Sequence, residues 1–207
     1  MKKFLFTLFI SLSTLAAATI HMAATKGDLQ ALQAEIDAGV DINLQNKKYG
    51  QTALALAVYN EHFDVVEYLL NKGAETNVRM KNGQSALFIA AYMGKNKMII
   101  SLLQHGAIIN IEDNVGDTPL HKAAEGGRSA AIKLLIEYGA KVNVINKTKS
   151  TPLHLAAKFN NEDAVWTLLK SGASDSFVND EGLKASDVAN EEENERIATI
   201  IEKYAKK

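Results

Sequence analysis

Apolar residues recur along the chain in a pattern typical of short amphipathic helices. Four segments carry two apolar residues four positions apart, a spacing that places both side chains on one face of a helix. The pairs are Val65 with Leu69, Met98 with Leu102, Ala131 with Leu135, and Ala164 with Leu168. We therefore predict helices over these segments, with the paired positions forming a buried seam.

Another kind of helix is predicted upstream of these segments, where a Thr-Pro step is followed by two small residues. The Thr118 hydroxyl can cap such a helix, and Pro119 then fills the first helical position, where a missing N–H costs nothing. The small residues Ala123 and Ala124 indicate that helices of neighbouring units approach closely. Thr151, Pro152, Ala156 and Ala157 repeat this pattern.

The end of this first helix is marked by residues suited to positive φ. Gly27, Gly94 and Gly127 stand there, and Asn160 can adopt the same conformation. Glu61 and Glu193 depart from the pattern, which predicts strained or looser junctions between helices at these two positions.

The pattern returns with a period of 33 residues. The threonine or serine that begins it lies at positions 52, 85, 118 and 151. Glycines follow the second helix at 39, 73, 106, 139 and 172, and asparagines stand at 43, 77, 110 and 143. The one interval of 34 residues reflects an extra residue in the loop after Asn43.

The sequence T-P-L-H-x-A-A, followed by an apolar helix and then G-A-x-x-N, resembles the ankyrin repeat. The resemblance implies an all-α solenoid of helix-turn-helix units joined by hairpin-like loops. We expect an ankyrin-repeat domain over residues 19–204, with five repeats and a shortened capping repeat, and a tail over 205–207. Glu35 and Glu202 replace leucines in the outer units, as expected where a repeat lacks one neighbour.

Residues 1–18 have the organisation of a secretory signal peptide. Lys2 and Lys3 precede an apolar run from Phe4 to Leu15, and a small-residue stretch at 16–18 offers a cleavage site. An uncleaved anchor and a buried helix of the first repeat are the alternatives. The signal interpretation predicts a periplasmic or secreted protein that begins at Thr19, with no membrane insertion after the signal is removed.

Composition narrows the classes of function. The formal net charge is −1, so no basic excess favours nucleic acid as a partner. Cysteine is absent, which excludes thiolate nucleophiles and Cys-ligated zinc. His21, His121 and His154 recur at the fourth motif position, where the resemblance implies hydrogen bonds to the adjoining loop. His62 and His105 lack the spacing of a metal site, so we expect no metal and no cofactor.

Catalysis is also unexpected. Acidic residues gather at Glu112-Asp113, Asp180-Glu181 and Glu191-Glu193, where solvated loops and a helix end explain them. No nucleophile elbow or phosphate-binding loop is present in the sequence. Because the repeats occupy residues 19–204, we predict that the chain is not an enzyme.

The resemblance implies that a protein partner is held on the concave side, by the first helices and the tips of the hairpin loops. Candidate contacts follow the small pair of each unit or lie in the loops. They are Tyr59, Asn60, Tyr92, Met93, Glu125, Lys158, Phe159, Lys48, Tyr49 and Lys81. The aromatic residues suit an interface anchor, although packing on their own repeat is the alternative.

Two other features bear on partners. The loop tips alternate in charge from one unit to the next, which could select a complementary protein. Ile100 and Trp166 occupy a second-helix position that is polar elsewhere, and they could mark a second contact or a dimer surface. We expect a monomeric adaptor or stabiliser of a protein partner. A secreted effector or enzyme inhibitor is the alternative, and a degenerate repeat enzyme is a third.

Overall fold

The computed structural model describes residues 19–205, and every regular element in this range is helical. Residues 19–26 form a helix, and the elements after it are α2 (Leu29–Asp37), α3 (Ala53–Tyr59), α4 (Phe63–Asn71), α5 (Ala86–Met93), α6 (Asn96–Gln104), α7 (Pro119–Glu125), α8 (Ser129–Glu137), α9 (Pro152–Lys158), α10 (Glu162–Lys170), α11 (Ala185–Glu191) and α12 (Glu195–Ala205). The predicted all-α class is confirmed. The predicted signal peptide, and Lys206 and Lys207, lie outside the described residues.

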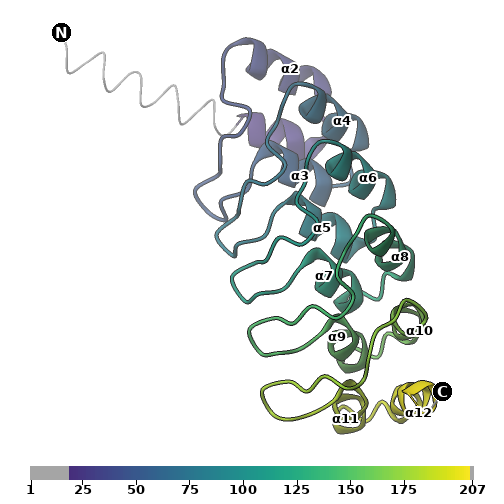
Figure 1. Ribbon diagram of the computed structural model, residues 1–207. Helices are drawn as coiled ribbons and strands as arrows, with labels where there is room; N and C mark the ends of the chain where they lie inside the picture. The colour runs from purple at the N-terminus through teal and green to yellow at the C-terminus, as the bar shows by residue number, and fades with distance from the viewer. Residues whose placement is uncertain (1–18, 206–207) are drawn as a thin grey trace. The chain divides into compact units, whose positions relative to one another are not determined.

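The described residues fall into two compact units, which divide between Ala86 and Leu87. In the first unit, α3 packs against α4. In the second unit, α7, α9 and α11 pack in succession, and α8, α10 and α12 form a parallel succession (Figure 1). We call α3, α5, α7, α9 and α11 the first helices of their repeats, and α4, α6, α8, α10 and α12 the second helices. The hairpin loops of the second unit project beside the first helices (Figure 1).

The predicted seam is confirmed as core. All eight residues of the four pairs have at most 4% of their surface exposed. The small residues of the first helices are buried as well, including Ala123, Ala124, Ala156 and Ala157 at 0%. Burial of small side chains on α7 and α9, which pack together, is what close helix approach requires.

The first helices α3, α7 and α9 begin in two ways. At α3 the Thr52 hydroxyl accepts a hydrogen bond from the Ala55 N–H at 3.2 Å, which satisfies one free donor of the first turn. At α7 and α9 a capping box forms, in which a histidine also accepts from the N-cap backbone. His121 Nδ1 accepts from the Thr118 N–H at 3.1 Å, and His154 Nδ1 accepts from the Thr151 N–H at 3.1 Å.

The junctions between the paired helices all use positive φ. Gly27, Gly94 and Gly127 have φ of 71°, 71° and 68°. Asn160, Glu61 and Glu193 take the same conformation at 56°, 65° and 60°. Left-handed backbone is strained for glutamate, so the strain predicted at Glu61 and Glu193 is confirmed in the backbone geometry.

A polar residue at the start of each second helix ties one repeat to the previous one. His62 Nε2 lies 3.0 Å from the Thr25 carbonyl, and Arg128 Nε donates to the Tyr92 carbonyl at 2.9 Å. Asn161 donates to the Ala124 and Glu125 carbonyls at 2.9 and 2.8 Å. These bonds satisfy carbonyls at the ends of the first helices, which lack partners within their own helix.

The recurring asparagines link successive hairpins. Asn110 accepts from the Lys141 N–H at 3.1 Å, and Asn143 accepts from the Ser174 N–H at 2.9 Å. In the first unit Asn43 accepts from the Glu75 N–H at 2.8 Å. Each asparagine therefore fixes the spacing between its own loop and the next one.

Candidate protein-binding surface

The aromatic candidates at the ends of the first helices are exposed. Tyr59, at the end of α3, has 59% of its surface exposed, and Tyr92, in the last turn of α5, has 46%. Phe159, the C-cap of α9, has 48% exposed. These three aromatic side chains are exposed at positions whose backbone is fixed by the end of a helix.

Within the second unit, neighbouring repeats hold the candidate positions close together. Arg128 binds the Tyr92 carbonyl, Asn161 binds the Glu125 carbonyl, and Asn194 donates to the Lys158 carbonyl at 3.3 Å. A Cβ built on Gly126 would lie 2.4 Å from the Tyr92 carbonyl oxygen. Position 126 must therefore remain glycine for α7 to approach the end of α5.

The polar candidates are partly engaged within the molecule. Lys122 pairs with Glu125 at 2.8 Å and with the buried Asp117 at 2.9 Å. Lys158 lies 3.8 Å from Glu192 in an exposed ion pair. Met93, beside Tyr92, is partly exposed. The Glu125 carboxylate is consequently held in place, whereas the Lys158 ammonium remains accessible.

The loop candidates of the first unit lie together at the hairpin tips. The Lys81 N–H donates to the Tyr49 carbonyl at 3.0 Å, and Lys81 Nζ donates to the Lys47 carbonyl at 2.6 Å. Lys48 Nζ lies 4.7 Å from the centroid of the Tyr49 ring, which is itself exposed. At the end of α3 in the same unit, Asn60 Nδ2 donates to the Leu56 carbonyl at 2.8 Å.

One acidic residue predicted to be solvated is buried. Asp113 has only 6% of its surface exposed, and its carboxylate accepts from the Val115 and Asp117 N–H groups, each at 3.0 Å. The side chain folds back on the tip of its own hairpin, at a position occupied by Asn46, Met80, Asn146 and Asn179 in other repeats. The prediction that Asp113 is solvated is therefore wrong.

The histidines of the motif have structural partners. His21 Nε2 lies 2.8 Å from the Leu44 carbonyl, His121 Nε2 lies 3.0 Å from the Ser150 carbonyl, and His154 Nε2 lies 3.1 Å from the Leu183 carbonyl. Burial lowers the pKa of His121 and of His154. Since their Nδ1 atoms accept hydrogen bonds, both rings are neutral and carry the proton on Nε2. Within residues 19–205, no cluster of three or more His, Asp or Glu residues could hold a metal ion.

Two features escaped the sequence reasoning. Residues 62, 95, 128, 161 and 194 recur at 33 residues, and their hydrogen-bonding side chains could have been found from that period. Trp166 lies edge to face with Tyr204, with ring centroids 6.4 Å apart. The sequence reasoning did not foresee this ring contact, and the proposal of a second contact or dimer surface at Trp166 stays a prediction.

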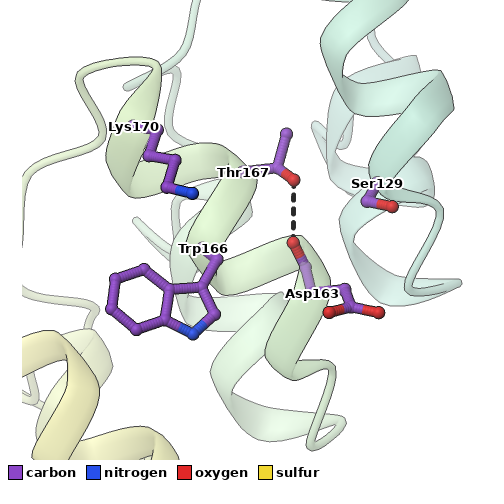
Figure 2. Close-up of a pocket in the computed structure, with 5 residues that line it drawn as sticks. All are labelled: Ser129, Asp163, Trp166, Thr167 and Lys170. Atoms are coloured by element: carbon purple, nitrogen blue, oxygen red, sulfur yellow. Dashed lines mark hydrogen bonds between the residues drawn. The ribbon is translucent and has the colours of Figure 1, made fainter.

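Trp166 also borders a shallow hollow of about 360 Å³ between α8 and α10. The lining residues are Ser129, Asp163, Trp166, Thr167 and Lys170 (Figure 2). The Thr167 hydroxyl donates to the Asp163 carbonyl at 2.8 Å, a bond within α10. The indole of Trp166 points away from Ser129 (Figure 2).

Comparison with known proteins identifies the repeats. The family model "Ankyrin repeats (3 copies)" matches residues 20–113 and 108–180. The chain belongs to the ankyrin-repeat family. Ankyrin repeats are a protein interaction module, and proteins built from them are generally non-catalytic scaffolds.

The similar curated proteins are much longer than the segments they share with this ankyrin-repeat chain. Ankyrin repeat and SAM domain-containing protein 6 of Rattus norvegicus is 38% identical over 66 residues, which is 32% of this chain and 8% of the relative. Ankyrin repeat domain-containing protein 40 of Homo sapiens is 39% identical over 59 residues, 28% of this chain and 16% of the relative. Nuclear factor NF-kappa-B p105 subunit of Gallus gallus is 46% identical over 54 residues, 26% of this chain and 6% of the relative. Among the described residues, no helix is both long and apolar enough to cross a membrane.

Proposed function

We propose that the chain is an exported adaptor that binds a protein partner through the ends of its first helices and the tips of its hairpin loops. This is the concave side in an ankyrin stack. The observation that carries the proposal is the exposure of Tyr59, Tyr92 and Phe159, at 59%, 46% and 48%. Exposed aromatic side chains supply large contact area at a low cost in conformational entropy.

The contrast between recurring and variable residues supports this assignment. Recurring polar residues, such as His121, Asn143 and Asn161, make hydrogen bonds between repeats. The variable residues Tyr92 and Phe159 present side chains that the fold leaves exposed. Residues needed for folding are thereby separated from residues available to a partner.

Binding without catalysis fits the chemistry of the polar groups. The buried histidines His121 and His154 are committed to capping and to bonds with the next hairpin. The Glu125 carboxylate is held by Lys122. The proposed role is therefore to hold or steady a protein partner.

Export rests on the pattern of residues 1–18. It is tested by intact-mass analysis of the protein recovered from the cell envelope, which should begin at Thr19. A mass that retains residues 1–18 would contradict both export by a cleaved signal and the periplasmic assignment. Recovery mainly from culture medium or from a target cell would favour the secreted effector instead.

The binding face is tested with the double variant Tyr59→Ser/Tyr92→Ser. A partner identified by affinity pull-down from the native envelope should bind it more weakly by at least about 2 kcal/mol, the level of an interface hot spot. The matched control is Phe63→Ser/Tyr138→Ser, which removes two exposed aromatic rings next to second helices. Circular dichroism checks that both variants fold. Unchanged affinity in the first variant, or loss only in the second, defeats the assignment.

A further inference from the structure

The second unit carries an apolar groove that the proposed function does not use. The groove lies between α10 and α12 and encloses about 760 Å³. Trp166 lines it from α10, and α12 contributes Arg196, Thr199, Ile200, Lys203 and Tyr204. The Trp166 and Tyr204 rings meet at 77° within it. These are second helices, so the groove is separate from the aromatic residues at the first-helix ends.

Helix α12 has two apolar faces, and only one is needed for folding. Ile197, Ala198 and Ile201 are buried and pack the helix into the unit. Ile200 and Tyr204, four residues apart, are only partly buried and line the groove instead. A second apolar stripe on a helix already packed by its first is typical of a contact surface.

Charges are sorted around the groove. Both cationic residues that line it, Arg196 and Lys203, come from α12, whereas the exposed Glu195 and Glu202 of the same helix do not line it. Lys170 Nζ lies 5.7 Å from the centroid of the Trp166 ring, but Lys170 lines the neighbouring hollow and not the groove. The rim of the groove is therefore basic in a chain whose net charge is −1.

One of these cations already has a weak partner. Arg196 pairs with Glu162 at 2.9 Å, and 80% of the Arg196 side chain is exposed. An ion pair this exposed is weak, so the guanidinium can turn to an incoming carboxylate at little cost. The hollow on the other side of Trp166 is mixed in charge, because both Asp163 and Lys170 line it.

We propose that this groove binds an amphipathic helix of a partner protein that carries carboxylates beside its apolar face. Helix α12 has 11 residues and spans about 16 Å at 1.5 Å per residue, so it can face about three turns of a second helix. Aliphatic residues of the partner at positions i, i+4 and i+7 contact Trp166 and Ile200. Its carboxylates face Arg196 and Lys203.

A second copy of this chain fits the groove less well. In a two-fold symmetric contact each patch meets itself, so the basic rims of the two copies would face each other. Like charges opposed across an interface are unfavourable, whereas an acidic helix neutralises them.

The experiment uses Trp166, the only tryptophan of the chain, as its reporter. A displayed library of helical peptides of about 14 residues, sized to the three turns of the groove, is selected on the full chain. Enriched peptides should be net acidic with aliphatic residues at helical spacing. Free peptides without tryptophan are then titrated while Trp166 emission is followed, and emission should shift to shorter wavelength and saturate.

Variants of the rim and of the floor complete the test. Lys203→Glu should weaken binding about tenfold or more by reversing a rim charge, and Ile200→Ser should weaken it comparably. Lys141→Glu, the same charge change on an exposed loop of the same unit, should leave affinity unchanged. Three results would overturn the proposal. The library could fail to enrich acidic peptides, Lys203→Glu could bind peptide as tightly as the wild type, or Trp166 emission could change with protein concentration in the absence of peptide. The last result would assign the groove to a second copy of the chain.

Discussion

The repeat that begins at Thr52 and the repeats that begin at Thr118 and Thr151 build the same first helix with different residues. At Thr52 the hydroxyl alone caps the helix, and Ala55 stands at the fourth motif position. At Thr118 and Thr151 that position is a buried histidine, which caps its own helix with Nδ1 and reaches the next hairpin with Nε2.

The difference separates two roles that the repeat pattern combines. The hydroxyl cap is local and suffices to begin a helix, as α3 shows. The histidine adds a bond over 29 residues, from His121 to the Ser150 carbonyl and from His154 to the Leu183 carbonyl. Histidine therefore couples neighbouring repeats, and the repeat at Thr52 lacks this histidine link.

The largest effect should appear in apolar packing, when a seam residue of the second unit is compared with an edge residue of the first unit. Leu135→Ala removes a fully buried seam residue of α8 and should cost about 2–5 kcal/mol. Val40→Ala, at a partly exposed position of the first unit, should cost less. Urea unfolding of both variants measures the free energies. The reverse ranking would show that the seam of the second unit does not carry its stability.

The histidine link is tested next. His154→Ala removes the hydrogen-bond partner of the Thr151 N–H and of the Leu183 carbonyl. It should lower the free energy of unfolding by about 1–3 kcal/mol, because buried polar groups lose their partner. The control is His62→Ala in the first unit, whose ring binds the Thr25 carbonyl at a more exposed site. The control should cost less. Equal losses would mean that burial adds nothing to the link.

The sequence predicts much of this architecture because the landmarks of the repeat have local causes. A threonine can cap, a proline fits the first turn, and glycine fits positive φ, so their positions define the helix ends. The side-chain bonds between repeats are less accessible to sequence reasoning. Arg128, Asn161 and His62 each form a hydrogen bond with a backbone carbonyl of the previous repeat, but they do so with different side-chain groups. In the sequence, only their 33-residue spacing connects them.

The candidate surface is harder to predict for a physical reason. Exposure of Tyr92 follows from its place on the helix, but the environment of Trp166 depends on Tyr204, which lies 38 positions away in sequence. Asp113 likewise looks like a surface charge, and the turn geometry of its own hairpin buries it. Contacts set by tertiary packing or by turn conformation are invisible to hydrophobic periodicity.

The pH dependence of stability should differ between the regions. Burial lowers the pKa of His121 and His154 in the folded state, so the unfolded chain binds their protons more readily. The two neutral rings contribute fully to the free energy of unfolding above the unfolded-state pKa of about 6.5. This contribution is lost as the pH falls below that value, by at most about 1.4 kcal/mol per pH unit for each ring.

Urea unfolding between pH 7 and pH 5 measures this loss. The variant His121→Gln/His154→Gln should be less stable at pH 7 but should lose less stability on acidification than the wild type. Parallel pH profiles would show that these rings do not titrate on unfolding.

The smallest predicted effect concerns the helix junction of the repeat at Thr52. Glu61 has φ of 65°, where its equivalents Gly94 and Gly127 carry no Cβ. Left-handed backbone costs a residue with a Cβ about 1–2 kcal/mol. Relief of this strain is partly offset, by about 0.4–1 kcal/mol, because glycine has more conformational entropy in the unfolded chain. Glu61→Gly should therefore stabilise the protein by about 0.5–1 kcal/mol. Asn160→Gly is the matched variant at φ of 56°, and its gain should be smaller because asparagine tolerates this conformation. Thermal and urea unfolding of both variants should rank Glu61→Gly above Asn160→Gly. If Glu61→Gly instead destabilised the protein, interactions of the Glu61 side chain would outweigh the backbone strain, and the two regions would differ in more than the chemistry of their caps.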